Sequence, residues 1–178
     1  IGVTRPTTAN PAGIAGPNSA NGIFINTQEA SVVQDLQILN NTLRNNGQNN
    51  THAGLLFQRE DKSLLTSTSV GERAVTISGN TIGGNRNGIL LDGRNGSIDL
   101  LDFEVSGNFI GVDATGTDIG NINDGINLRT EADARMLVDL TSNQIRFNNG
   151  SGINLNDVFS NFSTDNRQVG GTWINNTN

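Results

Sequence analysis

Residues 75–91 read VTISGNTIGGNRNGILL and contain both elements of a repeat that runs through most of the chain. One element is a Gly followed by apolar-x-apolar, here Gly88 to Leu91. The other is apolar-x-apolar-x-x-Asn-x-apolar, here Val75 to Ile82. Each apolar-x-apolar unit is too short for a helix and has the period of two that places alternate side chains on opposite faces of a strand. The stretch therefore predicts short strands separated by Asn and Gly corners.

Both elements recur in strict alternation along the chain. The first begins at Gly22, Gly54, Gly88, Gly125 and Gly152, in steps of 32, 34, 37 and 27 residues. The second carries its Asn at Asn41, Asn80, Asn108 and Asn143, with a degenerate copy at residues 173–177. A return after about 30 residues is typical of repeats that stack on their neighbours. The sequence therefore predicts parallel strands stacked in about five coils.

Stacking predicts where the repeated side chains lie. The flanking residues of each apolar-x-apolar unit should point inward and form one apolar column: Ile23, Ile25, Leu55, Phe57, Ile89, Leu91, Ile126, Leu128, Ile153 and Leu155. The Asn at its fixed place in each coil should adopt left-handed backbone at a corner. It should also hydrogen-bond its counterparts in neighbouring coils as a ladder.

Composition agrees with a turn-rich repeat and excludes several classes of function. The 178 residues are enough for one domain, and they include 28 Asn and 22 Gly but only 34% hydrophobic residues. The net charge of -6 argues against nucleic-acid binding and against anionic membrane surfaces. No run approaches the roughly 20 apolar residues of a membrane span. The absence of Cys excludes disulfides and thiolate metal sites.

The copies Val75 to Ile82 and Phe103 to Ile110, followed by residues 111–117 (GVDATGT) and Asn123 to Ile126, resemble a known family. They are similar to the right-handed parallel β-helix repeats of pectate-lyase-like proteins, closest to those of large secreted or surface-displayed bacterial proteins. The resemblance covers residues 21–178 and leaves residues 1–20 as an N-terminal extended segment or partial coil. It implies an all-β, single-stranded right-handed parallel β-helix of about five coils, located outside the cell or on its surface.

No amphipathic helical cap is recognisable at either end of the repeat, although residues 156–172 could supply a partial lid, and solenoids normally carry polar or helical caps. We therefore expect a fragment of a longer chain, or copies that stack end to end. Self-association or a protein partner is thus predicted, and a polysaccharide is a further candidate ligand.

For an enzyme of this fold that acts on acidic polysaccharide, the resemblance implies clustered Asp with a catalytic Arg or Lys, or paired Asp with a His. The nearest candidates are Asp92, Asp102, Asp124, Arg94 and Arg129. No complete catalytic motif of the family is present, and Asp residues at corners are usually solvated. The resemblance therefore favours a non-catalytic structural or adhesive module, with a polysaccharide lyase or hydrolase as the alternative. An ice-binding solenoid needs a regular outward Thr or Asn array, and Glu104 and Asp139 stand where Thr76 would have to repeat.

Two further features suggest ligands or partners. Asp113, Asp118 and Asp124 lie in the longer excursion 111–124 and could ligate calcium, although their spacing matches no defined calcium loop. No other cofactor is predicted.

The middle residue of each apolar-x-apolar unit should point outward, and Phe24, Leu56 and Leu90 make an apolar stripe there before Asn127 and Asn154 follow. Such a stripe needs a cover, either residues 1–20 or a partner surface.

Overall fold

The computed structural model describes residues 18–27, 32–47, 52–59, 64–66, 74–93, 100–130 and 135–157. These residues form fifteen strands and no helix, so the predicted all-β class is confirmed. Within the same residues no helix is long and apolar enough to span a membrane. The predicted boundary at residue 20 falls just inside the first described segment, and residues 158–178, with the predicted fifth copy of the Asn element, lie outside the description.

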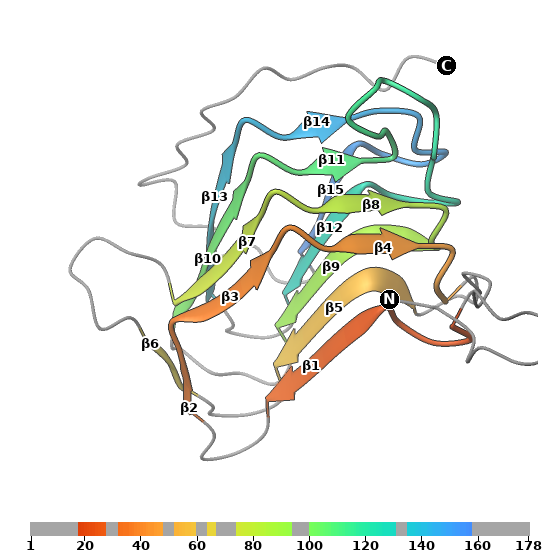
Figure 1. Cartoon of the computed structure of the whole chain (residues 1–178). Coiled ribbons are helices and arrows are strands. Elements are labelled where there is room, and N and C mark those ends of the chain that lie inside the picture. Colours follow the sequence, from red (N-terminus) through yellow and green to blue (C-terminus); the bar gives the residue numbers. More distant parts are fainter. Residues whose placement is uncertain are drawn as a thin grey trace, which may run out of the picture.

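The strands form parallel sheets that the chain visits in turn (Figure 1). The first sheet holds five strands in the order β1 (Ile23–Thr27), β5 (Ala53–Arg59), β9 (Asn87–Gly93), β12 (Ile126–Thr130) and β15 (Ile153–Asp157). The second has the order β13 (Arg135–Thr141), β10 (Leu100–Ser106), β7 (Val75–Ser78) and β3 (Leu36–Leu39). The third has the order β14 (Gln144–Ile145), β11 (Phe109–Ile110), β8 (Thr81–Gly83) and β4 (Thr42–Arg44). A two-stranded sheet pairs β2 (Val32–Gln34) with β6 (Leu64–Thr66).

Equivalent residues of the repeat lie side by side in these sheets. We call the chain from one strand of the first sheet to the next a circuit. In successive circuits Ile23 pairs with Leu55, Leu55 with Ile89, Ile89 with Ile126, and Ile126 with Ile153. The register that self-alignment of the sequence predicts is therefore confirmed along the whole first sheet.

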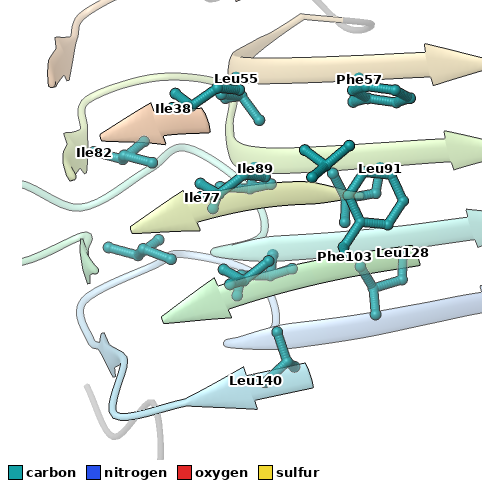
Figure 2. Packing of buried hydrophobic residues seen from close by; sticks show 14 of the residues in the cluster. Ile38, Leu55, Phe57, Ile77, Ile82, Ile89, Leu91, Phe103, Leu128 and Leu140 are labelled. Carbon is teal, nitrogen blue, oxygen red and sulfur yellow. The ribbon is translucent and has the colours of Figure 1, made fainter. Parts of the chain in front are cut away.

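The apolar column between the sheets is the core (Figure 2). Leu55, Ile89 and Ile126 are fully buried, and the rings of Phe57 and Phe103 meet edge to face across the core at 5.1 Å. Leu155, which was predicted to be buried in the column, is 52% exposed. The reason is its place on β15, which has a neighbouring strand on one side only among the strands that the structure describes.

The predicted Asn ladder is present in the corner between the second and third sheets. The backbone N and Nδ2 of Asn41 both donate to Oδ1 of Asn80, at 2.8 and 3.1 Å. Asn80 donates in the same way to Asn108, and Asn108 to Asn143. We call these four residues the first Asn ladder.

The prediction that the ladder Asn itself adopts left-handed backbone is wrong. The residue with positive φ is the one before it: Asn40, Gly79, Gly107 and Ser142, with φ of 55°, 66°, 62° and 55°. This turn directs the N–H of the ladder Asn along the stack, where Oδ1 of the next rung accepts it.

A second Asn ladder, which the sequence analysis missed, lies at the next corner. Its rungs are Asn18, Asn46, Asn85, Asn121 and Asn148, joined by side-chain hydrogen bonds of 2.7–3.2 Å. Four of the rungs are almost completely buried, with exposures of 0–2%. The two ladders satisfy buried backbone and amide groups at two corners of each circuit, as buried polar groups require.

Candidate functional site

The outward side of the first sheet carries the described candidate catalytic residues. Asp92 on β9 lies in register with Arg129 on β12. Arg129 Nε donates to Asp92 Oδ1 at 2.8 Å and Nη2 donates to Oδ2 at 2.6 Å. Asp92 is 2% exposed. This two-point pairing is the strongest geometry that a guanidinium and a carboxylate can adopt, so both charges are engaged within the chain.

Asp124 lies immediately before β12 and is 4% exposed. Its Oδ1 accepts the N–H of Ser151 at 2.9 Å. Its Oδ2 accepts the side-chain amides of Asn127 and Asn154, both at 2.9 Å, and that of Asn123 at 3.4 Å. The carboxylate is therefore held by four neutral donors, which compensate its burial.

The described members of the predicted catalytic set do not converge on one point. The N–H of Asp124 points at Oδ1 of Asn87, at the start of β9, whereas Asp92 lies five residues further along that strand. At about 3.3 Å per residue the two positions are roughly 16 Å apart. Asp102 belongs to β10 in the second sheet, and its side chain and Arg94 lie outside the described residues.

The excursion that follows β11 holds two of the predicted calcium ligands. Val112 and Asp118 form an antiparallel bridge, and Gly116 turns the chain with a φ of 86°. Asp113 Oδ1 accepts the Thr115 hydroxyl at 2.6 Å and the N–H groups of Thr115 and Thr117, both at 2.9 Å. The Thr115 hydroxyl, with help from the Thr117 N–H, lowers the pKa of Asp113.

Asp118 is also bound within the excursion, because its Oδ1 accepts the Gly120 N–H at 2.8 Å. Asp124 instead binds donors at the start of the first sheet. Across the described part of the chain, no three His, Cys, Asp or Glu side chains form a group that could hold a metal ion. The structure thus places the three predicted calcium ligands in separate hydrogen-bonded arrangements.

The predicted partner surface is divided. Phe24 on β1 is 53% exposed and Leu90 on β9 is partly buried, but Leu56 on β5 is only 6% exposed. Leu56 is therefore covered within this chain. The stripe turns polar at Asn127 and Asn154, whose amides bind Asp124. The proposed cover, residues 1–20, lies outside the description apart from residues 18–20.

The sequence analysis missed a cationic corner where the strands of the third sheet end. Arg44 is the last residue of β4, Arg86 follows β8, and Arg146 follows β14. Exposed Ile122 and Phe147 lie at the same corner, with exposures of 40% and 38%. We call these five residues the arginine corner. The sequence could have revealed these arginines through their spacing, because each lies within two residues of a rung of the second Asn ladder.

No protein-family model, curated protein or solved structure matches this chain. The assignment of a function therefore depends on the geometry of its own residues.

Proposed function

We propose that the chain is a right-handed parallel β-helix that acts as a non-catalytic structural or adhesive module outside the cell or on its surface. The parallel sheets, the in-register apolar column and the two Asn ladders support the β-helix part of the proposal. The handedness and the location follow from the resemblance of the repeats.

The observation that carries the non-catalytic role is the engagement of the described candidate side chains. An acid or base must have a proton or lone pair available within hydrogen-bond reach of the substrate. The Asp92 carboxylate faces the Arg129 guanidinium, and Asp124 accepts four donors of the chain itself. Substrate would have to displace these contacts before either carboxylate could react.

The rival function, cleavage of acidic polysaccharide, gives a direct test. Purified chain is incubated with a panel of polyuronates, with calcium or with a chelator, and both unsaturated products and new reducing ends are measured. We expect no cleavage above a blank.

The matched variants are Arg129→Gln, which breaks the pair with Asp92, and Asn26→Ala, which changes an exposed residue of the same sheet. Cleavage by the wild-type chain that Arg129→Gln abolishes and Asn26→Ala preserves would refute the non-catalytic proposal, provided both variants unfold thermally like the wild type.

A further inference from the structure

Four Asn-Gly pairs lie within the described residues, with their Asn at Asn21, Asn46, Asn87 and Asn149. In such a pair the backbone nitrogen of the Gly can attack the side-chain amide of the Asn, because Gly has no side chain that hinders the approach. In all four pairs the Gly N–H donates to a backbone carbonyl. The pairs therefore differ in how the Asn side chain is held.

Three of the four Asn side chains are held by hydrogen bonds. Asn21 Oδ1 accepts the Ala53 N–H at 2.7 Å. Asn46 is a fully buried rung of the second Asn ladder. Asn87 is 5% exposed, and its Nδ2 donates to the His52 carbonyl at 3.3 Å. These contacts must break before any of the three side chains can turn its amide carbon toward the following nitrogen.

Asn149 differs from these three residues. Its side chain is exposed and makes no hydrogen bond in the part of the chain that the structure describes. Only the backbone is tied at this bend, where the Asn149 N–H donates to the Asn121 carbonyl at 3.0 Å and the Gly150 N–H to the Asn123 carbonyl at 2.9 Å. The Asn149 side chain can therefore approach the Gly150 nitrogen as soon as the bend opens locally.

We infer that Asn149 is the described Asn-Gly site at which the folded chain undergoes spontaneous deamidation. The Gly150 nitrogen attacks Cγ of Asn149 and gives up its proton to water, the Cγ–Nδ2 bond breaks, and ammonia leaves. Water then opens the cyclic succinimide that this step forms. Attack at Cγ restores the ordinary peptide bond and leaves Asp, whereas attack at the backbone carbonyl leaves an isoaspartyl linkage through Cγ. The reaction needs no reactant besides water, and the inference is independent of the proposed structural role.

Either product adds a negative charge at the edge of the arginine corner. The N–H groups of Asn149 and Gly150 donate to the carbonyls of the residues on either side of Ile122, a member of that corner. Another member, Arg146, precedes Asn149 by three residues, and its Nε is buried without a hydrogen-bond partner. The conversion therefore lowers the positive charge of the arginine corner.

The isoaspartyl product also lengthens the backbone between residues 149 and 150 by one CH₂ group. The two N–H groups that follow are both engaged, that of Gly150 with the Asn123 carbonyl and that of Ser151 with Asp124 Oδ1, each at 2.9 Å. Gly150 lies so close to Asp124 that a Cβ at this position would be 2.6 Å from Oδ1. The longer backbone thus disturbs both hydrogen bonds, whereas the Asp product keeps them.

Peptide mapping of aged protein tests the assignment. One sample of the chain is kept folded in mildly alkaline buffer, and a second is kept unfolded in the same buffer with urea. Trypsin then places each Asn-Gly pair on a separate peptide, because Arg44, Arg86 and Arg146 lie between them in the sequence. Tandem mass spectrometry identifies the residue at which an amide has become a carboxylate.

In the folded sample we expect Asn149 to convert at least about tenfold faster than the three held Asn residues, because each of these must first lose its hydrogen bonds. In urea all four should convert at rates within about threefold of one another, since no fold distinguishes them. If Asn149 converts no faster than the held residues in the folded sample, while the urea sample converts at all four, the inference is overturned.

The matched variant is Asn149→Gln, whose longer side chain would have to close a larger ring. The peptide 147–167 of this variant should stay unconverted in the folded sample. Conversion that persists in this peptide at the wild-type rate would place the reaction at another Asn and would also overturn the inference.

Brief proteolysis of the aged protein in moderate urea tests the consequence for the fold. Isoaspartyl molecules should be cleaved first, with an unfolded fraction about tenfold larger than that of the unmodified chain, because two backbone hydrogen bonds are disturbed. The Asp product and the variant Asn149→Asp, which carry the same charge on an ordinary backbone, should resist cleavage like the wild type. Equal resistance of the isoaspartyl molecules would overturn the predicted distortion. The non-catalytic proposal would stand in every one of these cases, since only polysaccharide cleavage refutes it.

Discussion

Replacing the central rung of the first Asn ladder tests how much the ladder contributes to stability. Asn80 is fully buried. Its Oδ1 accepts the N–H and the side-chain amide of Asn41, and its Nδ2 donates to Asn108 Oδ1 and to the carbonyls of Ile38 and Ser78. Asn80→Ala therefore leaves the Asn41 N–H and the Ile38 carbonyl without these partners, whereas the Ser78 carbonyl still accepts the Asn40 N–H.

The magnitude follows from those two groups. A buried polar group left unsatisfied costs about 1–3 kcal/mol, so Asn80→Ala should lower the free energy of unfolding by about 3 kcal/mol. The matched control is Asn41→Ala at the end of the same ladder. Asn41 is only half-buried, and one of its side-chain bonds, to the Leu39 carbonyl, is solvent-exposed. Water can replace the side-chain hydrogen bonds that Asn41→Ala removes, so this variant should lower the free energy of unfolding by only about 0.5–1 kcal/mol.

Urea unfolding followed by far-ultraviolet circular dichroism gives both free energies, and thermal unfolding gives an independent comparison. At about 2–4 °C per kcal/mol for a chain of this size, Asn80→Ala should melt roughly 4–8 °C below Asn41→Ala. If the two variants lose the same free energy of unfolding, within about 0.5 kcal/mol, burial of a rung does not determine how much it stabilises the fold, and the reasoning is refuted.

The remaining predictions concern a glycine, a buried carboxylate and an exposed one. In urea unfolding, Gly111→Ala should lower the free energy of unfolding by about 2 kcal/mol more than Gly107→Ala. Both residues have positive φ, but only the new Cβ at 111 would clash with a backbone carbonyl, that of Arg146. Asp124→Asn should lower the free energy of unfolding by about 2 kcal/mol, because both carboxylate oxygens accept N–H groups of the chain. In either orientation the NH₂ group of the new amide would face one of these donors. An unchanged melting temperature would contradict this prediction. For Asp113, whose pKa is lowered in the folded chain, the stability it contributes is present above its unfolded pKa and is lost as the pH falls through the lower folded value. An NMR titration should therefore show its pKa rising toward the ordinary range in Thr115→Val, and no change in that variant would rule out the hydroxyl as the main cause.

The strands and the core were predictable because they depend on a local pattern repeated at nearly constant intervals. A Gly followed by alternate apolar residues marks each strand of the first sheet, and aligning the copies gives the register that the structure shows. The first Asn ladder was predictable for the same reason, since its Asn keeps a fixed place relative to the preceding strand.

The second Asn ladder was hidden by an insertion. Its rungs Asn46, Asn85 and Asn148 each follow a rung of the first ladder by five residues, but Asn121 follows Asn108 by thirteen. The extra residues form the excursion stabilised by Asp113, which closes on itself through the bridge between Val112 and Asp118. An alignment that assumes a fixed spacing cannot detect a rung that follows such an insertion, although Asn121 takes its place in the ladder directly after the excursion.

The polar residues show why a list of candidate side chains does not identify a site in a stacked fold. Register places equivalent residues of two circuits side by side, although they are 27 residues apart in the sequence for Asn121 and Asn148 and 37 residues apart for Asp92 and Arg129. Where the equivalent residues are both Asn they form a ladder, and where they are Asp92 and Arg129 they neutralise each other. Where they are Glu104 and Asp139, two acidic residues occupy facing positions of neighbouring strands. A candidate side chain in a stacked fold therefore has to be judged together with its register partner before a function is assigned to it.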